Sequence, residues 1–425
     1  MNVKKTNDTM QLIGNGLAAG ALSMLLVAFP ASAQDSNIVV QCPEATAEHP
    51  NIKCIHLVAG DGMVTMADDM IDPEDGVPGK KQYIFSFAQV PLPGVDGAPT
   101  EASGQYPGWV MDRGILAANA PAPTISVDED DELFLSLTNV GMAMRPDLFD
   151  PHTVHWHGFP EASSIFDGVP DSSVSINMGA TLTYYYNVKD AGTYMYHCHV
   201  EATEHMQMGM LGNLFVRPRQ NKLDDGTALG SYTHSTGDTY AYNDGDGSTL
   251  YDVEYPIQMG SFDPDFHDAS LNVQPLPFAG MRDRYFMLNG RGYPDTVNDT
   301  VLSTTDPLGT IQNSQPVDSL VSASPNQRVL LRISNLNITE FYTLGSNLPM
   351  QVVAHDARLL RDGAGSNMYY TTNSVTLGGG QSADVIIDTT GLAPGSTYFL
   401  YSTNLDRLSN DAENFGGMMT EIRIN

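Results

Sequence analysis

Six of the eleven histidines in this chain fall in two short segments, beside a cysteine and a methionine. The first segment reads His152-Thr-Val-His155-Trp-His157-Gly158. The second begins with His197-Cys198-His199 and continues through His205 to Met210. Two imidazoles, a thiolate and a weak thioether are the ligand set of a blue-copper electron-transfer centre. The thiolate favours Cu(I) and imidazoles also hold Cu(II), so this set serves both oxidation states. Zinc is the main rival, but a thioether is a poor zinc ligand.

Strand geometry predicts how these side chains divide between two sites. Alternate side chains of a strand share a face, so His155 and His157 point one way and Trp156 points the other. For the same reason the two histidines of the 197–199 segment point away from Cys198. One strand therefore offers imidazoles to one metal site and a thiolate to a second site behind it. The peptide link between the two sites is a short path for an electron.

The surrounding sequence predicts strands that position these segments. The runs 132–139 (ELFLSLTN) and 327–335 (QRVLLRISN) alternate apolar and polar residues, which is the period of a strand. Later in each half, GTYMY at 192–196 resembles STYFLY at 396–401, and GMLGNLFV at 209–216 resembles GMMTEIRI at 417–424. We therefore predict an all-β chain made by duplication of a β-sandwich domain.

The duplication sets the expected domain boundaries. Residues 34–225 are predicted to form the first domain and residues 249–425 the second, joined by a polar, glycine-rich linker at 226–248. The linker ends in NDGDGS, which resembles a Ca²⁺ loop. It lacks the spaced ligands and terminal glutamate of an EF-hand, so an ordinary exposed turn is the better interpretation.

The charge of the chain excludes some classes of partner. Asp and Glu number 50 against 20 Lys and Arg, for a formal net charge of -30. A nucleic-acid partner needs a basic face, and docking on anionic lipid needs a polybasic patch, so neither is expected. An acidic surface attracts cationic partners or metal ions instead.

The N-terminus has the features of a secretory signal peptide at residues 1–33. Lys4 and Lys5 precede an apolar stretch at 16–29, and Ala31-Ser32-Ala33 matches a signal-peptidase site. A membrane anchor is the alternative, but the run is short and contains Gly and Ser. No later segment is long and apolar enough to span a bilayer, so we predict a soluble protein that is periplasmic or secreted.

The other two cysteines, Cys42 and Cys54, lie close together near the predicted mature N-terminus. In an oxidising compartment a disulfide between them is the simplest prediction. A metal site that also includes His49 and His56 is the alternative, but nothing else nearby completes a ligand set.

The two histidine segments also resemble a known family. HTVHWHG and HCHVEATEHMQMGM are similar to the copper motifs of multicopper oxidases, in the two-domain, laccase-like branch. The resemblance runs from about Tyr83 to Asn425 and includes LNGRGYPDT at 288–296, VVAHD at 352–356 and GGMMTEI at 416–422. It implies two cupredoxin-like Greek-key β-sandwich domains, a blue copper that takes electrons from substrate, and a trinuclear copper cluster that reduces dioxygen to water.

The resemblance also implies a role for each ligand. The blue-copper ligands are His152, Cys198, His205 and Met210, and this domain's half of the trinuclear ligands is His155, His157, His197 and His199. Met208 is an alternative axial ligand, but the length of the loop from His205 to Met210 matches that in cupredoxins. Two-domain relatives form homotrimers, with each cluster between the first domain of one subunit and the second domain of its neighbour.

The second half departs from this pattern. Aligning the halves puts Tyr342, Leu344, Tyr401 and Thr403 where the second set of paired histidines belongs, with Ser402 in place of the cysteine. The second half has only His234, His267 and His355, which are not spaced as a pair, and we interpret His267 and His355 as structural. The sequence thus supplies one complete blue site and half of a cluster. The four imidazoles of this half-cluster allow three interpretations. They hold one or two copper ions, or a partner chain supplies the missing ligands, or they are the remnant of a cluster that no longer forms.

These observations leave three functional hypotheses. The first is an exported copper-binding oxidoreductase. Electrons enter at His205, on a loop near the surface, and pass through Cys198 to the paired histidines. Oxygen reduction by such a protein requires that the missing ligands of the cluster are supplied. Its donor is a small molecule, a metal ion or a redox protein. The alternative is a blue-copper electron carrier or copper-binding protein without oxidase activity. A copper nitrite reductase-like protein ranks third, because His155 stands where that family places an aspartate.

Overall fold

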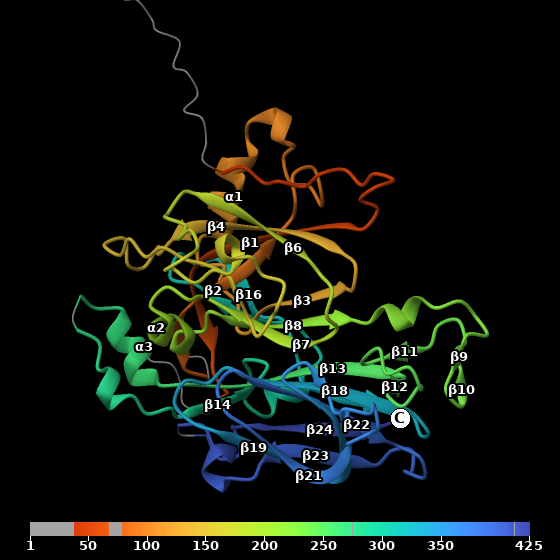
Figure 1. Cartoon of the computed structure of the whole chain (residues 1–425). Helices are drawn as coiled ribbons and strands as arrows, with labels where there is room; N and C mark the ends of the chain where they lie inside the picture. Colours follow the sequence, from red (N-terminus) through yellow and green to blue (C-terminus); the bar gives the residue numbers. More distant parts are fainter. Residues whose placement is uncertain (1–37, 68–78, 274, 412) are drawn as a thin grey trace, which may run out of the picture. The chain divides into compact units, whose positions relative to one another are not determined.

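Strands dominate the computed structural model, which describes residues 38–67, 79–273, 275–411 and 413–425 (Figure 1). This confirms the predicted all-β class. The predicted signal peptide lies outside the described residues. Within the described ranges, no helix is long and apolar enough to cross a membrane.

Two four-stranded sheets form the first half of the chain, with the orders β2-β1-β4-β6 and β3-β8-β7-β5. Their strands are β1 (Ile52–Thr65), β2 (Lys81–Val90), β3 (Ala122–Asp128), β4 (Glu132–Gly141), β5 (His155–His157), β6 (Thr181–Asn187), β7 (Gly192–His197) and β8 (Leu211–Arg217). The pairs β1–β4 and β3–β8 are parallel, so the chain crosses between the sheets rather than turning back as simple hairpins. The alternating leucines of β4 and the ring of Trp156 in β5 are buried in one core.

The second half forms a larger sheet around a separate core. Its main strand order is β14-β13-β18-β22-β19-β23-β24-β17, and β20 and β21 also pair with β19. The strands are β13 (Val253–Phe262), β14 (Tyr285–Leu288), β17 (Val321–Ala323), β18 (Arg328–Asn335), β19 (Tyr342–His355), β20 (Arg358–Leu359), β21 (Tyr370–Leu377), β22 (Gln381–Asp388), β23 (Thr397–Ser402) and β24 (Met419–Ile424). Strand β19 shifts register along its length and so pairs with several neighbours.

Short elements complete the fold. The helices are α1 (Tyr106–Gly114), α2 (Ala202–Gln207) and α3 (Pro264–Ser270), and the short strands are β9 (Ala228–Leu229), β10 (Tyr232–Thr233), β11 (Thr239–Tyr240), β12 (Leu250–Tyr251), β15 (Leu302–Thr305) and β16 (Ile311–Gln315). The segment predicted as a linker therefore contains three of these strands. Its Tyr242 is buried and donates a hydrogen bond to Asp384 in β22. In its NDGDGS turn, Asp244 accepts hydrogen bonds from backbone N–H groups of the same turn, including that of Gly247.

A buried polar network joins the two halves at β7, β18 and β22. Thr193 in β7 donates a hydrogen bond to Asp384, and Ser382 donates one to the Thr193 carbonyl. Arg332 in β18 is buried, with its guanidinium 2.9 Å from Glu254 and 3.8 Å from Asp384. Figure 1 shows β7 and β8 next to β13 and β18. The sheet that carries the paired histidines is thus held against the second half of the same chain.

The excursion between β13 and β14 packs on the loop that follows Cys198. His267 in α3 is buried, with Nδ1 beside the Tyr83 carbonyl and Nε2 beside the Gln207 carbonyl. Both contacts are to backbone oxygens, as expected for a structural histidine. Helix α3 of the second half therefore supports helix α2, which carries His205.

Cys42 and Cys54 are joined by a disulfide, with an S–S distance of 2.04 Å. The alternative metal site is not formed. His49 contacts Glu132 instead, and both ring nitrogens of the buried His56 are bonded to hydroxyl groups, those of Tyr106 and Thr138. The disulfide fixes the N-terminal arm to β1.

Candidate metal centres

The thiolate pocket forms where β7 ends and the following loop returns to β8. The sulfur of Cys198 lies 3.2 Å from Nδ1 of His205 and 3.9 Å from Nδ1 of His152. Backbone hydrogen bonds close the loop, because Met210 donates to the His205 carbonyl and Cys198 donates to the Met210 carbonyl. The side chains of all four residues are fully buried. The structure therefore brings together His152, Cys198 and His205 of the expected blue-copper set and holds the backbone of Met210 beside them.

This donor set fits a copper ion. One ligand atom from each of His152, Cys198 and His205 lies within 4.8 Å of the others. The two imidazole rings are 5.1 Å apart and tilted by 57°, so both can direct Nδ1 at an ion beside the sulfur. A thiolate with two imidazoles is the donor set of copper electron-transfer sites, and here all three side chains are buried.

Burial and charge determine which imidazole of the pocket is neutral. Burial, and then the neighbouring His205, hold the pKa of His152 well below its ordinary value. Burial also opposes a charge on His205, but Cys198 and Asp150 outweigh it and raise its pKa to about 10. In the metal-free protein His205 thus carries a proton toward the sulfur. A cation at the same place replaces that proton.

The structure distinguishes Met208 from Met210 as candidates for the axial copper ligand. Both Met208 and Met210 are buried. The sulfur of Met208 accepts a hydrogen bond of 3.4 Å from Ser270 in α3. Since that sulfur is engaged by the second half of the chain, we keep Met210 as the axial ligand of our assignment.

The paired histidines form a second cluster on the other side of β7. Strands β5 and β7 are antiparallel with His155 opposite His197, which brings their imidazoles together. The ring of His155 lies 5.1 Å from the rings of both His197 and His199. Nδ1 of His157 is 3.4 Å from Nε2 of His197. This is the division between two faces of one strand that the alternation predicts.

Backbone contacts orient two of these rings. Nδ1 of His155 donates to the Asp167 carbonyl at 2.6 Å, and Nδ1 of His197 donates to the Cys198 carbonyl at 2.7 Å. Because a carbonyl oxygen only accepts, Nδ1 carries the hydrogen in both rings, and Nε2 is the nitrogen that can face a metal ion. Burial lowers the pKa of His197 to about 3, and burial followed by the charge of His155 lowers that of His157. Neutral imidazoles with free lone pairs fit a metal ion.

The second half of the chain covers this cluster. A cavity of about 510 Å³ is lined by the four histidines, Met206, residues 336–341, Gly379 and Gly380. A Cβ atom on Gly380 would lie only 2.6 Å from Nε2 of His157. The β18–β19 connection at 336–341 and the turn before β22 carry no sequence signal for a metal site, so only the tertiary structure reveals their role.

The predicted equivalents of the missing histidines lie elsewhere. Tyr342 was aligned with His155 and Tyr401 with His197, yet Tyr401 pairs with Gly345 rather than with Tyr342. Tyr342 is buried, with its hydroxyl bonded to Ser261. Leu344, Ser402 and Thr403 do not line the cavity either, among the residues described there. The register of β23 on β19 therefore differs from that of β7 on β5, and the placement of the missing histidines stays a prediction.

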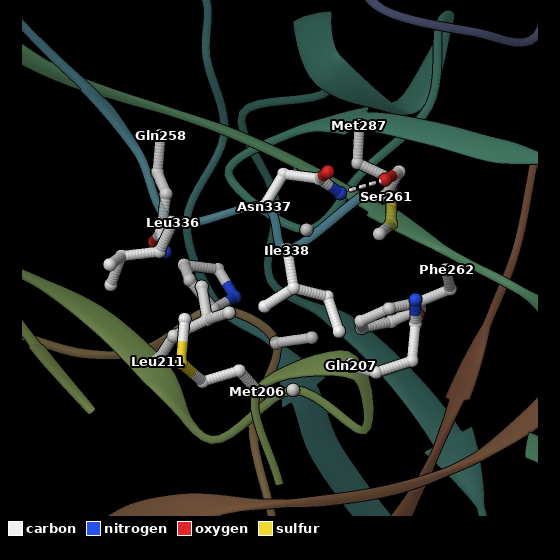
Figure 2. A pocket seen from close by; sticks show the side chains of 15 residues that line it. Met206, Gln207, Leu211, Gln258, Ser261, Phe262, Met287, Leu336, Asn337 and Ile338 are labelled. Carbon is white, nitrogen blue, oxygen red and sulfur yellow. Dashed lines mark hydrogen bonds between the residues drawn. The ribbon is translucent and has the colours of Figure 1, made fainter. Parts of the chain in front are cut away.

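A smaller cavity adjoins the cluster between the two halves. Figure 2 shows Met206, Leu336, Asn337 and Ile338, which line both cavities. Gln258 also lines the smaller cavity, and neither polar atom of its buried side chain has a hydrogen-bond partner in the described structure. The accessible space is about 30 Å³, enough for about two water molecules.

The position of His205 differs from expectation in one respect. Helix α2 lies at the surface, since Glu201 and Thr203 are exposed. The imidazole of His205 is nevertheless 0% exposed. The edge of the Phe85 ring and the neighbouring Asp150 cover it. A donor therefore meets side chains of the surrounding surface rather than the His205 ring itself.

Comparison with known proteins relates the first half to one family. Residues 110–221 match the family model described as multicopper oxidase. Multicopper oxidase MCE of Talaromyces pinophilus is 32% identical over 124 residues, which is 29% of this chain and 19% of that protein. L-ascorbate oxidase of Cucurbita pepo var. melopepo is 24% identical over 289 residues, which is 66% of this chain and 45% of that protein. The chain thus spans less than half the length of these curated relatives.

Solved structures show the same fold. The blue copper oxidase from Nitrosomonas europaea superimposes with a TM-score of 0.57 and 19% identity, covering 88% of this chain and 86% of that one. Another crystal structure of a multicopper oxidase gives a TM-score of 0.54 at 16% identity and covers 91% of this chain and 93% of that one. At these identities the likeness establishes two cupredoxin-type sandwich domains and no more.

Proposed function

We propose that the chain is an exported copper oxidoreductase of the laccase-like multicopper oxidase type, which the match of residues 110–221 to the multicopper oxidase family model supports. It accepts electrons one at a time at the thiolate pocket and passes them to the four-histidine cluster. Copper bound at these sites would supply one-electron chemistry by alternating between Cu(II) and Cu(I).

The observation that carries this proposal is the position of Cys198 between His197 and His199. The thiol faces one pocket while both neighbouring imidazoles face the other cluster. The Cys198 carbonyl also accepts the Nδ1 hydrogen of His197 at 2.7 Å. The two sites are therefore linked through the backbone of a single residue, both covalently and by this hydrogen bond.

The residues around the thiol prepare it for electron transfer. His152 and His205 hold the sulfur between two ring nitrogens, and the burial of all three side chains excludes water. A buried, rigid copper site keeps nearly the same geometry when the metal gains or loses an electron. A small change in geometry favours rapid electron transfer. The loop closed by Met210 and Cys198 keeps this geometry fixed.

Dioxygen reduction by this chain requires histidines from outside it. Four imidazoles come from the first half, whereas the second-half residues that line the cavity include Asn337, Thr339 and Glu340 but no histidine. We propose that the lone chain does not carry out four-electron oxygen reduction, and that a partner chain, in a homotrimer or another assembly, must supply further ligands for it to do so.

Copper counting combined with paramagnetic resonance tests the proposal. The copper-loaded chain should bind more than one copper per chain, one with the narrow hyperfine splitting of a blue site and strong visible absorption. His157→Ala should remove the non-blue copper and leave the blue signal. A single blue copper per chain would favour the electron-carrier alternative, and no blue signal would refute the proposal. Oxygen consumption with phenolic donors should be weak.

A further inference from the structure

A cavity of about 460 Å³ lies between the first half of the chain and the β15–β16 hairpin of the second half. Its lining comes from the end of β2 and the loop after it, helix α1, the segment before β3 and strand β16. It shares no lining residue with the two cavities beside the paired histidines. Asn119 donates a side-chain hydrogen bond to the Asn313 carbonyl at 2.8 Å, and Ala120 donates a backbone one to the Ser314 carbonyl at 2.9 Å. The cavity therefore has the volume and the anchored walls of a small-molecule site.

One wall of this cavity holds an indole ring in a fixed position. Trp109 in α1 stacks on Tyr106, one helical turn earlier, with ring centroids 5.8 Å apart and ring planes 22° apart. Tyr106 is buried, and its hydroxyl donates to the Pro91 carbonyl at 2.8 Å and lies 2.7 Å from Nδ1 of His56. Trp109 itself is half-buried. Its ring therefore has little freedom to move when a ligand enters the cavity.

Arg113, one helical turn after Trp109, places a positive charge at the same cavity. Its guanidinium carbon lies 5.7 Å from the centre of the indole ring, which is a cation–π contact. Among the residues that the structure describes, Arg113 has neither an ion pair with a carboxylate nor a hydrogen bond. A guanidinium that lies on an aromatic ring keeps its planar set of N–H donors for a carboxylate. In a chain with a formal net charge of -30, an arginine without a carboxylate partner at a cavity indicates an anionic ligand.

Other polar groups of the lining can bind hydroxyl groups. Asp96 borders the cavity and forms neither an ion pair nor a hydrogen bond within the described ranges. The same holds there for the side chain of Gln89 and for the side-chain oxygen of Asn119. A carboxylate accepts hydrogen bonds, and an amide both accepts and donates them. A ligand with several hydroxyl groups can therefore use all three side chains at once.

We propose that this cavity binds a uronic acid, which is a sugar ring that carries one carboxylate and several hydroxyl groups. The carboxylate pairs with Arg113, and the hydroxyl groups bind Asp96, Gln89 and Asn119. A charged, planar pair of this kind is among the stronger hydrogen-bonded contacts in proteins. The site requires no copper, so this proposal stands apart from the proposed function.

Other ligand classes satisfy only part of this lining. A neutral sugar binds the hydroxyl-binding groups but leaves the guanidinium of Arg113 without an anion. An aromatic carboxylate pairs with Arg113 but leaves Asp96 without a partner, and Trp109 is already in contact with Tyr106 and Arg113. The formal net charge of -30 repels a long polyanion, which favours a single uronic acid or a short oligomer.

Calorimetric titration of the full chain with galacturonate tests the site, with and without copper. Wild-type protein should bind one galacturonate, and Arg113→Gln should weaken binding at least tenfold because it removes the charge that pairs with the carboxylate. Arg282→Gln removes the same charge from another exposed arginine and should not change binding. Both variants should keep the circular dichroism of the wild type. Absence of binding to the wild type, or equal binding by wild type and Arg113→Gln, would overturn the proposal.

Tryptophan fluorescence locates the bound ligand. The chain contains two tryptophans, of which Trp156 is 0% exposed and Trp109 lines the cavity. Galacturonate should therefore protect the emission of Trp109 from quenching by acrylamide. At the same concentration it should not protect Arg113→Gln. Calorimetric binding that leaves the quenching of the wild type unchanged would place the ligand elsewhere and overturn the site.

A comparison of ligands tests the chemical class. Galactose, which lacks the carboxylate, and benzoate, which lacks the hydroxyl groups, should each bind at least tenfold more weakly than galacturonate. Asp96 has a φ of 47°, which asparagine tolerates, so Asp96→Asn should keep the loop and weaken galacturonate but not benzoate. Benzoate as tight as galacturonate would make the ligand an aromatic acid, and galactose as tight would make it a neutral sugar. Either result would overturn the assignment of a uronic acid.

Discussion

The Nδ1 hydrogen of His197 is donated to the backbone carbonyl of Cys198, 2.7 Å away. This contact ties a ligand of the four-histidine cluster to the residue that supplies the thiolate of the other pocket. It also fixes the His197 ring so that Nε2 faces the cluster. Any change that moves one pocket therefore acts on the other through a single residue.

The two methionines of the Cys198 loop should respond differently to the same substitution. Met210→Leu should shift the visible spectrum and the reduction potential of the copper form, because it removes the weak thioether ligand. Met208→Leu should leave both unchanged, since its sulfur is engaged by Ser270. Each swap conserves volume and should lower the free energy of unfolding by less than about 1.5 kcal/mol. Visible spectroscopy and potentiometry on the two variants test this prediction. A spectral change only in Met208→Leu would make Met208 the axial ligand instead of Met210.

Gly380 should control the geometry of the four-histidine cluster. An alanine Cβ there would lie 2.6 Å from Nε2 of His157, so Gly380→Ala must displace that ring. We expect loss of the non-blue copper with the blue absorption retained, as measured by copper content and paramagnetic resonance. Gly395→Ala is the matched control, because Gly395 also has a positive φ but its Cβ meets nothing within 4 Å. Equal copper loss in both variants would mean that backbone strain, not contact with His157, is responsible.

Arg332 should be the main electrostatic support of the junction between the halves. It is 1% exposed and lies 2.9 Å from Glu254 and 3.8 Å from Asp384. Arg332→Met leaves the buried Asp384 without its cation, while Glu254 keeps Arg217 at 2.6 Å. Removing one partner of a buried charge pair costs about 3–5 kcal/mol in the free energy of unfolding. Urea denaturation measures the loss.

Arg423→Met provides the comparison for this loss. Arg423 pairs with Glu421 at 2.7 Å, but its side chain is 42% exposed. Such a pair contributes about 0–1 kcal/mol. A similar destabilisation in both variants would contradict the role assigned to Arg332.

Acid should destabilise the metal-free protein partly through His56. Burial lowers its pKa from 6.5 to about 4. Below pH 6.5 the unfolded chain therefore binds a proton that the folded chain resists, so stability falls as the pH drops from about 6.5 toward about 4. Between pH 7 and pH 5 this amounts to about 2 kcal/mol.

A variant comparison isolates that contribution. His56→Gln should reduce the pH dependence of the urea midpoint over this interval, whereas His355→Gln, which changes a histidine near the surface that contacts Tyr370, should not. If the urea midpoint of His56→Gln depends on pH as steeply as that of the wild type, groups other than His56 cause the acid sensitivity.

Local sequence was sufficient to predict the thiolate pocket and the division of the histidines. Strand alternation around Trp156 and Cys198 fixes which side chains share a face, and the register of β5 on β7 then brings His155 opposite His197. The all-β class followed from the same alternation, as β4 illustrates with its buried leucines.

Long-range packing determined what the sequence could not reveal. Strand β19 shifts register between Gly345 and Met350 and again between Val352 and Ala354, and no local sequence pattern signals such shifts. Likewise, the covering of the His205 ring depends on Phe85 and on Asp150, which come from other parts of the chain. Burial of a ligand by distant segments is a property of the tertiary structure.

The most direct test of the account is the visible spectrum of Cys198→Ser. A hydroxyl of similar size preserves the fold but cannot replace the thiolate as a donor to copper. We predict that the copper-loaded variant keeps the circular dichroism of the wild type and loses the intense visible absorption. Retention of that absorption by Cys198→Ser would contradict the assignment of Cys198 as the residue that joins the two sites.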